Sequence, residues 1–386
     1  MASSSSSSFS IQMPTDNNFD QNTAKLLLSH CGTLIVESFP SGSEFGIDLS
    51  IHYTGDKFLG IKLIPPGLHF IYFSLVSKQD STVAPRAGFF HYFNPGDVLI
   101  TKWDAQAEDL ILFRNDTEQM DRLRSSFASG SLDSHLGAYQ FDQYQTWVSL
   151  TDFISQELFL KLNPPCGRIF SASSLVYKPN ADGSVTARLD EHGLPEMVVA
   201  PESAIRFFCE PIPRRFLYPK DATAKEITLH SLDSTYTLDT ILASPSYGNV
   251  ENNLLGELQF VFIAFILGHV FDAFEYWRDM LRIICSARLA LSTRPDLYLS
   301  FIRVVHFQLK QTNEAIFADI VENENQVFQF MRTFMLNLRS AADNGVSLEL
   351  RRRGEKFVSA LQKSMRWNFD DEPDDELPMI VPTTSN

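Results

Sequence analysis

The sequence predicts an α+β multidomain protein, in which a β-rich N-terminal domain is followed by an all-α C-terminal helical domain. Three observations carry this prediction. Short runs of β-branched and aromatic residues, separated by turn sequences, occupy residues 33–103. Amphipathic helical patterns occupy residues 222–367, and the longest apolar run of the chain, at 254–291, lies within them.

The N-terminal domain is expected to begin with a short helix at 22–30. Strands are expected at 33–39, 44–50, 58–64, 68–74, 88–93 and 98–103. Between two of them, Pro66 presets its φ angle and Gly67 accepts a positive one, which is type II turn chemistry. The sequence at 94–97 is a hairpin signal. Evenly spaced strands and tight turns predict an antiparallel sandwich or a partly open barrel.

Two helices are expected after the strands, at 116–127 and 143–162. Residues 164–214 show no strong period, so we interpret them as a linker with one strand at 204–209. The helical domain should then start with a helix at 222–242, where Thr223 and Glu226 form the capping-box pattern. Further helices are expected at 296–309, 324–341 and 347–367.

The apolar run at 254–291 is too long for one helix of a compact domain, since it would extend roughly 55 Å. We expect a break near Gly268, which permits the left-handed conformation that ends helices. A membrane span is the alternative, but Glu257, Gln259 and the marginal length favour a core helix. We therefore expect 255–268 to form the framework of the helical domain.

These patterns divide the chain into five parts. They are a disordered Ser-rich tail at 1–20, the β-rich domain ending in a helix at 21–163, the linker at 164–214, the all-helical domain at 215–367 and an acidic flexible tail at 368–386.

The net charge of −15 makes a general nucleic-acid surface unfavourable, because phosphate binding needs a positive field. The four cysteines are scattered without CxxC spacing, which is typical of a reducing compartment. The Ser-rich start lacks the basic and apolar regions of a secretory signal. A plastid transit peptide also begins rich in serine, but this segment has no arginine.

Nucleotide-binding and hydrolase motifs are absent from the sequence, and we predict no catalytic, cofactor-binding or metal site. Several weaker groupings are more simply explained as structural or surface residues than as sites. They are the adjacent pair His30 and Cys31, the strand histidines His52, His69 and His91, and the carboxylates Glu44, Asp48 and Asp56, of which Glu44 and Asp48 were interpreted as a polar sheet edge.

The last part of the sequence has two distinctive features. Arg351, Arg352 and Arg353 begin a basic cluster, which is either an RNA contact or a solvated helix face. The acidic stretch at 370–376 is followed by the apolar residues at 377–381. A frayed terminus is the plain interpretation, and addition to a partner as a strand is the functional one.

The chain resembles the Aar-two splicing-factor family, whose members are assembly factors of the U-five small nuclear ribonucleoprotein. The resemblance rests on SEFGID at 43–48, KFLGIKLIPPGLHF at 57–70, PRAGFF at 85–90, WVSLTDFIS at 147–155, LGELQFVFIAFILG at 255–268 with FDAFEYWRDML after it, and RWNF at 366–369. The Ser-rich start, Met365 and the linker depart from the family pattern.

The resemblance implies a β-rich domain joined to a helical one and a non-enzymatic function. Family members bind the large central spliceosomal scaffold protein, at its RNase-H-like and Jab/MPN-like domains, and keep the helicase of the particle from occupying it. No cofactor, direct nucleic-acid contact or membrane is expected. Partner contacts are expected at Trp367, Phe369, Leu377, Met379, Ile380 and Val381. The alternatives are a small hydrolase with an interdomain cleft and a direct RNA-binding module.

Overall fold

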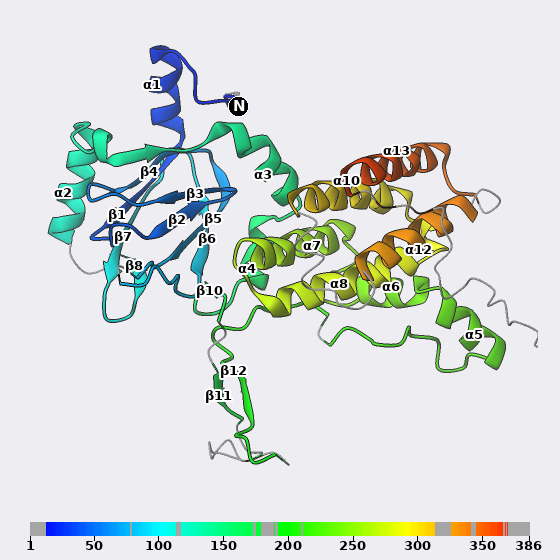
Figure 1. Cartoon of the computed structure of the whole chain (residues 1–386). Coiled ribbons are helices and arrows are strands. Elements are labelled where there is room, and N and C mark those ends of the chain that lie inside the picture. The colour runs from blue at the N-terminus through cyan, green and yellow to red at the C-terminus, as the bar shows by residue number, and fades with distance from the viewer. Residues whose placement is uncertain are drawn as a thin grey trace, which may run out of the picture. The chain divides into compact units, whose positions relative to one another are not determined.

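The chain forms two compact units in a computed structural model, shown in Figure 1. The β unit comprises Met1–Glu210 and Asn253–Tyr276, and the helical unit comprises Pro211–Asn252 and Trp277–Asn386. The residues that the structure describes are 13–77, 79–112, 117–172, 175–178, 189, 192–209, 211–312, 326–340, 345–365, 367 and 369. A β-rich N-terminal region and a helical C-terminal region confirm the predicted fold class.

Two five-stranded sheets form the β unit. The first has the order β8-β7-β1-β4-β9 and the second the order β10-β6-β5-β2-β3. Their strands are β1 (Gly32–Glu37), β2 (Glu44–Ile47), β3 (Ser50–Tyr53), β4 (Gly60–Ile64), β5 (Gly67–Ser74), β6 (Ala87–Phe93), β7 (Val98–Asp104), β8 (Asp109–Leu112), β9 (Leu136–Ala138) and β10 (Ile169–Phe170). The first sheet is mixed, because β1 pairs parallel with β7 and β4 pairs parallel with β9. Among the described strands no closed barrel forms.

The core of the β unit draws on both sheets. Leu34 and Val36 come from the first sheet, Phe45 and Phe73 come from the second, and all four side chains are buried in one cluster. Rings within the cluster meet edge to face, as Phe73 does with Trp103 at 5.7 Å between centroids. Apolar burial between two sheets is the main stabilising term of such a fold.

Two turns connect different sheets, contrary to the hairpin predicted at 94–97. Strand β6 before this turn lies in the second sheet, and β7 after it lies in the first. The turn with Gly67 likewise links β4 to β5 in the other sheet, with φ +136° at Gly67. The strand predicted at 44–50 is also divided, because Asp48 has a φ of +53° and ends β2.

The helices of this unit begin with α1 (Gln21–His30), whose N-cap Asp20 accepts a hydrogen bond from the Thr23 amide. Helix α2 (Thr117–Ala128) follows the strands as predicted. The single helix predicted at 143–162 is instead α3 (Tyr144–Thr151) and α4 (Gln156–Leu162). Ser155 starts α4 as a new N-cap, because its hydroxyl accepts from the Leu158 amide at 3.1 Å.

Part of the linker is a two-stranded sheet of β11 (Leu175–Tyr177) and β12 (Met197–Val199). The strand predicted at 204–209 is wrong, since those residues are turns and irregular backbone.

The apolar run is a helical hairpin of α7 (Glu251–Ile266) and α8 (Phe271–Ser286), which confirms the predicted break. The left-handed residue at the break is His269, with φ +57°, and not Gly268. Gly268 is required for another reason, since a Cβ there would lie 2.5 Å from the Ala264 carbonyl oxygen. Within the described ranges, every helix falls short of the length or the apolar character that a membrane span needs.

Helix α7 packs within the β unit and is not the framework of the helical domain that we expected. Its Phe260 ring stacks on Phe90 of β6 at 4.9 Å between centroids. Its Gln259 side chain accepts from the Phe153 amide at 2.8 Å and donates to the Asp152 carboxylate at 2.9 Å. Gln259 is one of the two polar residues that favoured a core helix over a membrane span. Its side chain hydrogen-bonds the corner between α3 and α4.

The helical unit contains α5 (Ala224–Leu232), α6 (Thr235–Leu242), the end of α8, α9 (Ala290–Thr293), α10 (Pro295–Gln311), α12 (Gln326–Ser340) and α13 (Leu348–Met365). The capping box of Thr223 and Glu226 is confirmed. The helix predicted at 222–242 is interrupted after α5. There Ser234 is fully buried and donates to the Ile283 carbonyl at 2.6 Å, which bends the chain onto α8.

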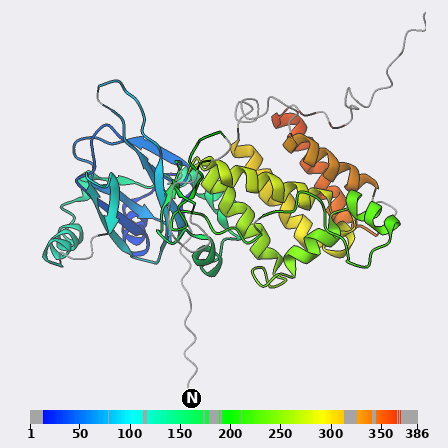
Figure 2. The same cartoon turned by 90° about the horizontal axis from the view of Figure 1, so that it is seen from below.

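The core of the helical unit is built from side chains of α8, α10, α12 and α13. Figure 2 shows these helices from below. Trp277 donates to the Gln308 side chain at 2.9 Å, and Tyr298 stacks on Phe334. Gly354 brings α13 close to α12, because a Cβ there would meet the Leu338 side chain at 2.0 Å. The basic helix α13 is thus seated on apolar neighbours.

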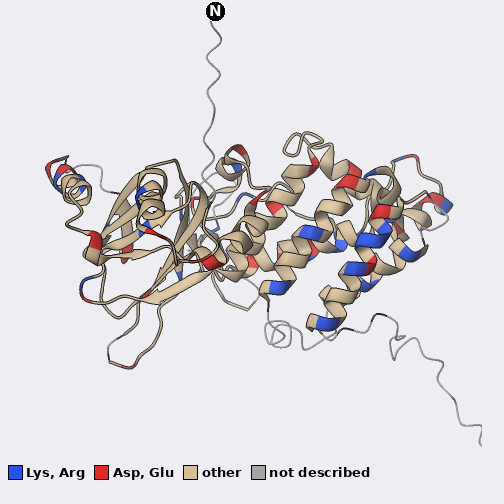
Figure 3. Ribbon diagram, turned by 90° about the horizontal axis from the view of Figure 1, so that it is seen from above, with Lys and Arg blue, Asp and Glu red and all other residues tan. Residues whose placement is uncertain are grey.

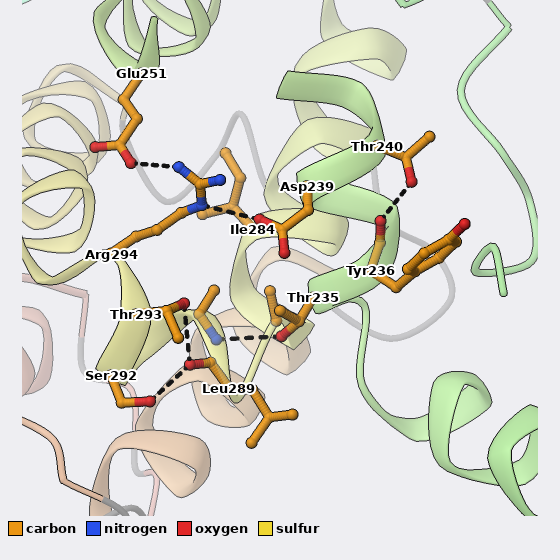
Figure 4. Close-up of polar contacts among 12 residues, drawn as sticks. Thr235, Tyr236, Asp239, Thr240, Glu251, Ile284, Leu289, Ser292, Thr293 and Arg294 are labelled. Carbon is orange, nitrogen blue, oxygen red and sulfur yellow. Dashed lines mark hydrogen bonds and ion pairs between the residues drawn. The ribbon is translucent and has the colours of Figure 1, made fainter. Parts of the chain in front are cut away.

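Arg294, the N-cap of α10, bridges α6 and the first residue of α7, as Figure 4 shows. Its guanidinium pairs with Asp239 of α6 at 2.9 Å and with Glu251 at 2.8 Å. Beside this pair, the Thr235 hydroxyl accepts from the Ala290 amide at 3.2 Å. These bonds fix the start of α10, where Pro295 occupies the first turn.

Candidate protein-interaction site

The described chain ends in an aromatic cluster of Phe328, Trp367 and Phe369. Phe369 is 3% exposed and stacks on Phe328 of α12, with 5.3 Å between ring centroids and an interplanar angle of 9°. Trp367 meets Phe328 edge to face at 5.6 Å. The segment that follows α13 is therefore anchored on α12, and the Phe369 ring is covered.

Of the partner-contact residues expected from the sequence, Trp367 and Phe369 are thus brought together on one helix. Trp367 is half-buried and Phe369 is buried. The others, Leu377, Met379, Ile380 and Val381, lie outside the described residues.

Helix α13 presents the basic cluster to solvent. Arg352, Arg353 and Lys356 are exposed, whereas Leu350 and Phe357 on the other side are buried. This is the solvated-face arrangement of an amphipathic helix. Positive charge on such a face remains available for an acidic partner.

Charge is unevenly divided between the two units. The β unit has 14 Lys and Arg against 27 Asp and Glu, whereas the helical unit up to Phe369 has 18 against 14. The basic positions are spread along the helices of that unit in Figure 3. The net charge of −15 therefore hides a helical unit that is positive until the acidic stretch at 370–376.

A buried polar network is the strongest acid–base grouping among the described residues. His69 Nδ1 lies 2.6 Å from Asp48 Oδ2, and the Tyr139 hydroxyl donates to the same oxygen at 2.7 Å. His69 Nε2 lies 2.7 Å from the Pro65 carbonyl oxygen, and the Phe70 amide donates to Asp48 Oδ1 at 3.0 Å. Burial, followed by the Asp48 charge, raises the Tyr139 pKa well above its ordinary value.

This network is structural, because a substrate has no access to it. Asp48 and His69 are each 1% exposed and Tyr139 is 3% exposed. Every polar atom of the Asp48 carboxylate has a donor, which satisfies the requirement for burying a charge. The network fixes the left-handed turn after β2 against β5 and β9.

The interpretation of Glu44 and Asp48 as a polar sheet edge is wrong. Strand β2 lies between β5 and β3 in the second sheet, so it has neighbours on both sides. Glu44 pairs with Arg86 at 3.3 Å. The alternation of residues predicted that the two acids share one face of the strand. It did not indicate that Glu44 pairs with Arg86 while Asp48 pairs with His69.

The strand histidines converge only in part. His69 of β5 and His91 of β6 are opposite each other in the register, and His52 lies on the edge strand β3. Burial lowers the pKa of His91 below its ordinary value. Among the described side chains, His, Cys, Asp and Glu nowhere gather in a group of three or more suited to a metal ion.

Arg86 joins sequence blocks that are far apart in the chain. Its guanidinium donates to the Leu267 carbonyl at 3.0 Å, pairs with Glu44, and lies 4.7 Å over the Tyr72 ring. Trp147 likewise donates to the Leu68 carbonyl at 2.8 Å. Sequence reasoning did not identify either contact as a joint of the fold, although both residues lie in blocks quoted for the resemblance.

Comparison with known proteins covers both units. A family model for the AAR2 N-terminal domain matches residues 30–164, and one for the AAR2 C-terminal repeat region matches residues 209–370. Protein AAR2 homolog of Mus musculus is 34% identical over 378 residues, which span 94% of this chain and 96% of that protein. The Homo sapiens homolog is 33% identical over the same shares. The Caenorhabditis elegans homolog is 32% identical over 87% of this chain and 94% of its own length. The chain therefore belongs to the AAR2 family.

Proposed function

We propose that this protein is a non-enzymatic assembly factor of the U-five small nuclear ribonucleoprotein in pre-mRNA splicing. In this proposal it binds the large central spliceosomal scaffold protein at its RNase-H-like and Jab/MPN-like domains. While bound, it holds off the helicase of the particle until maturation. It acts in the cytoplasm and the nucleus.

The observation that carries the proposal is membership of the AAR2 family, with both family domains in one chain. Membership supports a splicing-related assembly role. The burial of Asp48 and His69 supports the non-enzymatic part, because the strongest acid–base grouping of the described residues is closed to substrate. The aromatic cluster of Phe328, Trp367 and Phe369 and the basic face of α13 support recognition of a protein partner by the helical unit.

The tail at 377–381 contributes by adding as a strand to a sheet of the scaffold. Four of its five residues, Leu377, Met379, Ile380 and Val381, are apolar, and strand addition combines backbone hydrogen bonds with pockets for alternate side chains. The acidic stretch at 370–376 precedes it and is drawn to basic surface on the partner. Binding should therefore weaken as ionic strength rises.

The tail is tested by deleting residues 377–386. Co-precipitation and affinity are then measured with two purified fragments of the scaffold protein, its RNase-H-like domain and its Jab/MPN-like domain. We expect the affinity to fall about tenfold, because the added strand and its apolar contacts are lost. Deletion of residues 2–12 at the other terminus is the matched control and should leave the affinity unchanged. An unaltered affinity after the 377–386 deletion would exclude strand addition while leaving scaffold binding itself intact.

A further inference from the structure

The helical unit carries a pocket of about 530 Å³ that the family assignment does not explain. It lies between the segment after residue 211, helix α5 and helix α8. Three arginines line it, namely Arg214, Arg215 and Arg282, together with the rings of Phe216 and Tyr218. The lining thus combines positive charge with aromatic surface.

The floor of the pocket is held in place. Arg282 of α8 donates to the Pro213 carbonyl at 2.6 Å, and its guanidinium lies 5.4 Å from the Phe216 ring centroid. The Leu217 amide donates to the Thr237 hydroxyl of α6 at 2.7 Å. A site whose walls are fixed before binding loses less conformational entropy when a ligand arrives.

The positive charge of the pocket is not neutralised within the described chain. Arg214 and Arg215 are exposed, and neither has an acidic partner among the described residues. Arg282 has a single long ion pair, with Asp279 at 3.8 Å. Guanidinium groups in this state favour a carboxylate, which they bind in a bidentate manner.

Helix α5 adds an apolar wall that the described chain covers only in part. None of its residues is buried, although its N-terminus carries a complete capping box. Ile227 lines the pocket and is 36% exposed, and Leu232 at the end of the helix is 76% exposed. Exposed apolar side chains beside arginines are typical of an interaction surface.

We propose that this pocket binds an acidic peptide segment of a protein partner. Carboxylates of the segment pair with Arg214 and Arg215, and an apolar side chain packs between Phe216 and Ile227. Charge complementarity selects the acidic segment. The aliphatic wall favours a peptide over a nucleic acid, which requires a continuous basic track. The proposal holds whichever partner supplies the segment, so it stands apart from scaffold binding.

The test uses the full chain and fluorescence anisotropy of a labelled peptide of Glu and Asp with a central Leu and Phe. A companion peptide has Ser in place of Leu and Phe, and single-stranded polyuridine of equal charge is the nucleic-acid probe. We expect the double variant Arg214→Glu, Arg215→Glu to weaken peptide binding about tenfold or more. The matched control Arg122→Glu, Arg124→Glu, which changes two exposed arginines of α2 outside the pocket, should change it less than about twofold.

The apolar wall has a separate readout. Ile227→Ser should weaken binding of the Leu and Phe peptide and leave binding of the Ser peptide unchanged. The proposal is overturned if the peptide shows no saturable binding, or if both arginine pairs cause the same loss. It is also overturned if polyuridine binds more tightly than the peptide through Arg214 and Arg215. A chain ending at Phe369 that binds the peptide more tightly would make residues 370–386 the occupant instead.

Discussion

Asp48 holds together the turn between β2 and β3. It adopts a φ of +53°, and its carboxylate receives the Phe70 amide, the Tyr139 hydroxyl and the His69 ring. A non-glycine residue in this region is stabilised when its side chain bonds locally, and Asp and Asn are the residues that tolerate it. The residue type was visible in the sequence, whereas its partners, two on β5 and one directly after β9, were not.

Asp48→Asn should destabilise the protein by about 3 kcal/mol, because it removes the charge that faces His69 while keeping the backbone preference and the shape. Equilibrium denaturation measures this loss. Asp56→Asn, at an exposed position, is the control and should change stability by less than about 0.5 kcal/mol. Equal stability of the two variants would show that the buried charge of Asp48 contributes no more to the free energy of unfolding than the exposed charge of Asp56 does.

The four cysteines should react at very different rates. Burial raises the pKa of Cys31 to about 12 and that of Cys285 well above its ordinary value, and burial with the Glu257 charge raises the pKa of Cys209 to about 11. Cys166 is exposed. Since the thiolate is the reactive form, the native protein should show one fast thiol, which Cys166→Ser removes, and four thiols after denaturation. A fast thiol that remains in the Cys166→Ser variant would contradict the raised pKa of the other three cysteines, and three or more fast thiols would contradict the burial of Cys31 and Cys285.

Helix α7 shows what periodicity can and cannot predict at the scale of elements. Its apolar residues on all sides predicted a buried helix, and the break before α8 followed from Gly268. The unit that buries it was not predictable, because a helix without a polar face does not indicate which neighbour it packs on. Turn sequences also carry only local information. Those at 65–67 and 94–97 specify a bend but do not specify which sheet the next strand joins.

Gly256→Ala tests the close packing of α7 against the corner between α3 and α4. Alanine is normally favoured over glycine inside a helix by about 1 kcal/mol. Here the new Cβ would lie 2.4 Å from the Phe153 carbonyl oxygen and 2.4 Å from a Leu158 methyl group, so we expect destabilisation of about 2 kcal/mol. Gly55→Ala, which meets no atom within 4 Å, should be nearly neutral. A stabilised Gly256→Ala protein would mean that α7 and the corner do not touch.

At the scale of the whole molecule, the two units differ in charge and in the information that the sequence carried about them. The order of strands and helices was enough to predict the fold class. The positive charge of the helical unit was hidden by the acids of the β unit and of residues 370–376, so the composition of the whole chain did not reveal it. The pocket with Arg214 and Arg215 was missed for a different reason, because its residues come from three separate elements that only the fold brings together.

The central claim is that this AAR2-family chain binds the spliceosomal scaffold protein. The most direct measurement is calorimetric titration of the purified full chain with the RNase-H-like fragment and, separately, with the Jab/MPN-like fragment. We expect saturable one-to-one binding to at least one fragment with a Kd of about 1 μM or lower. The absence of binding to both fragments at tens of micromolar would contradict it.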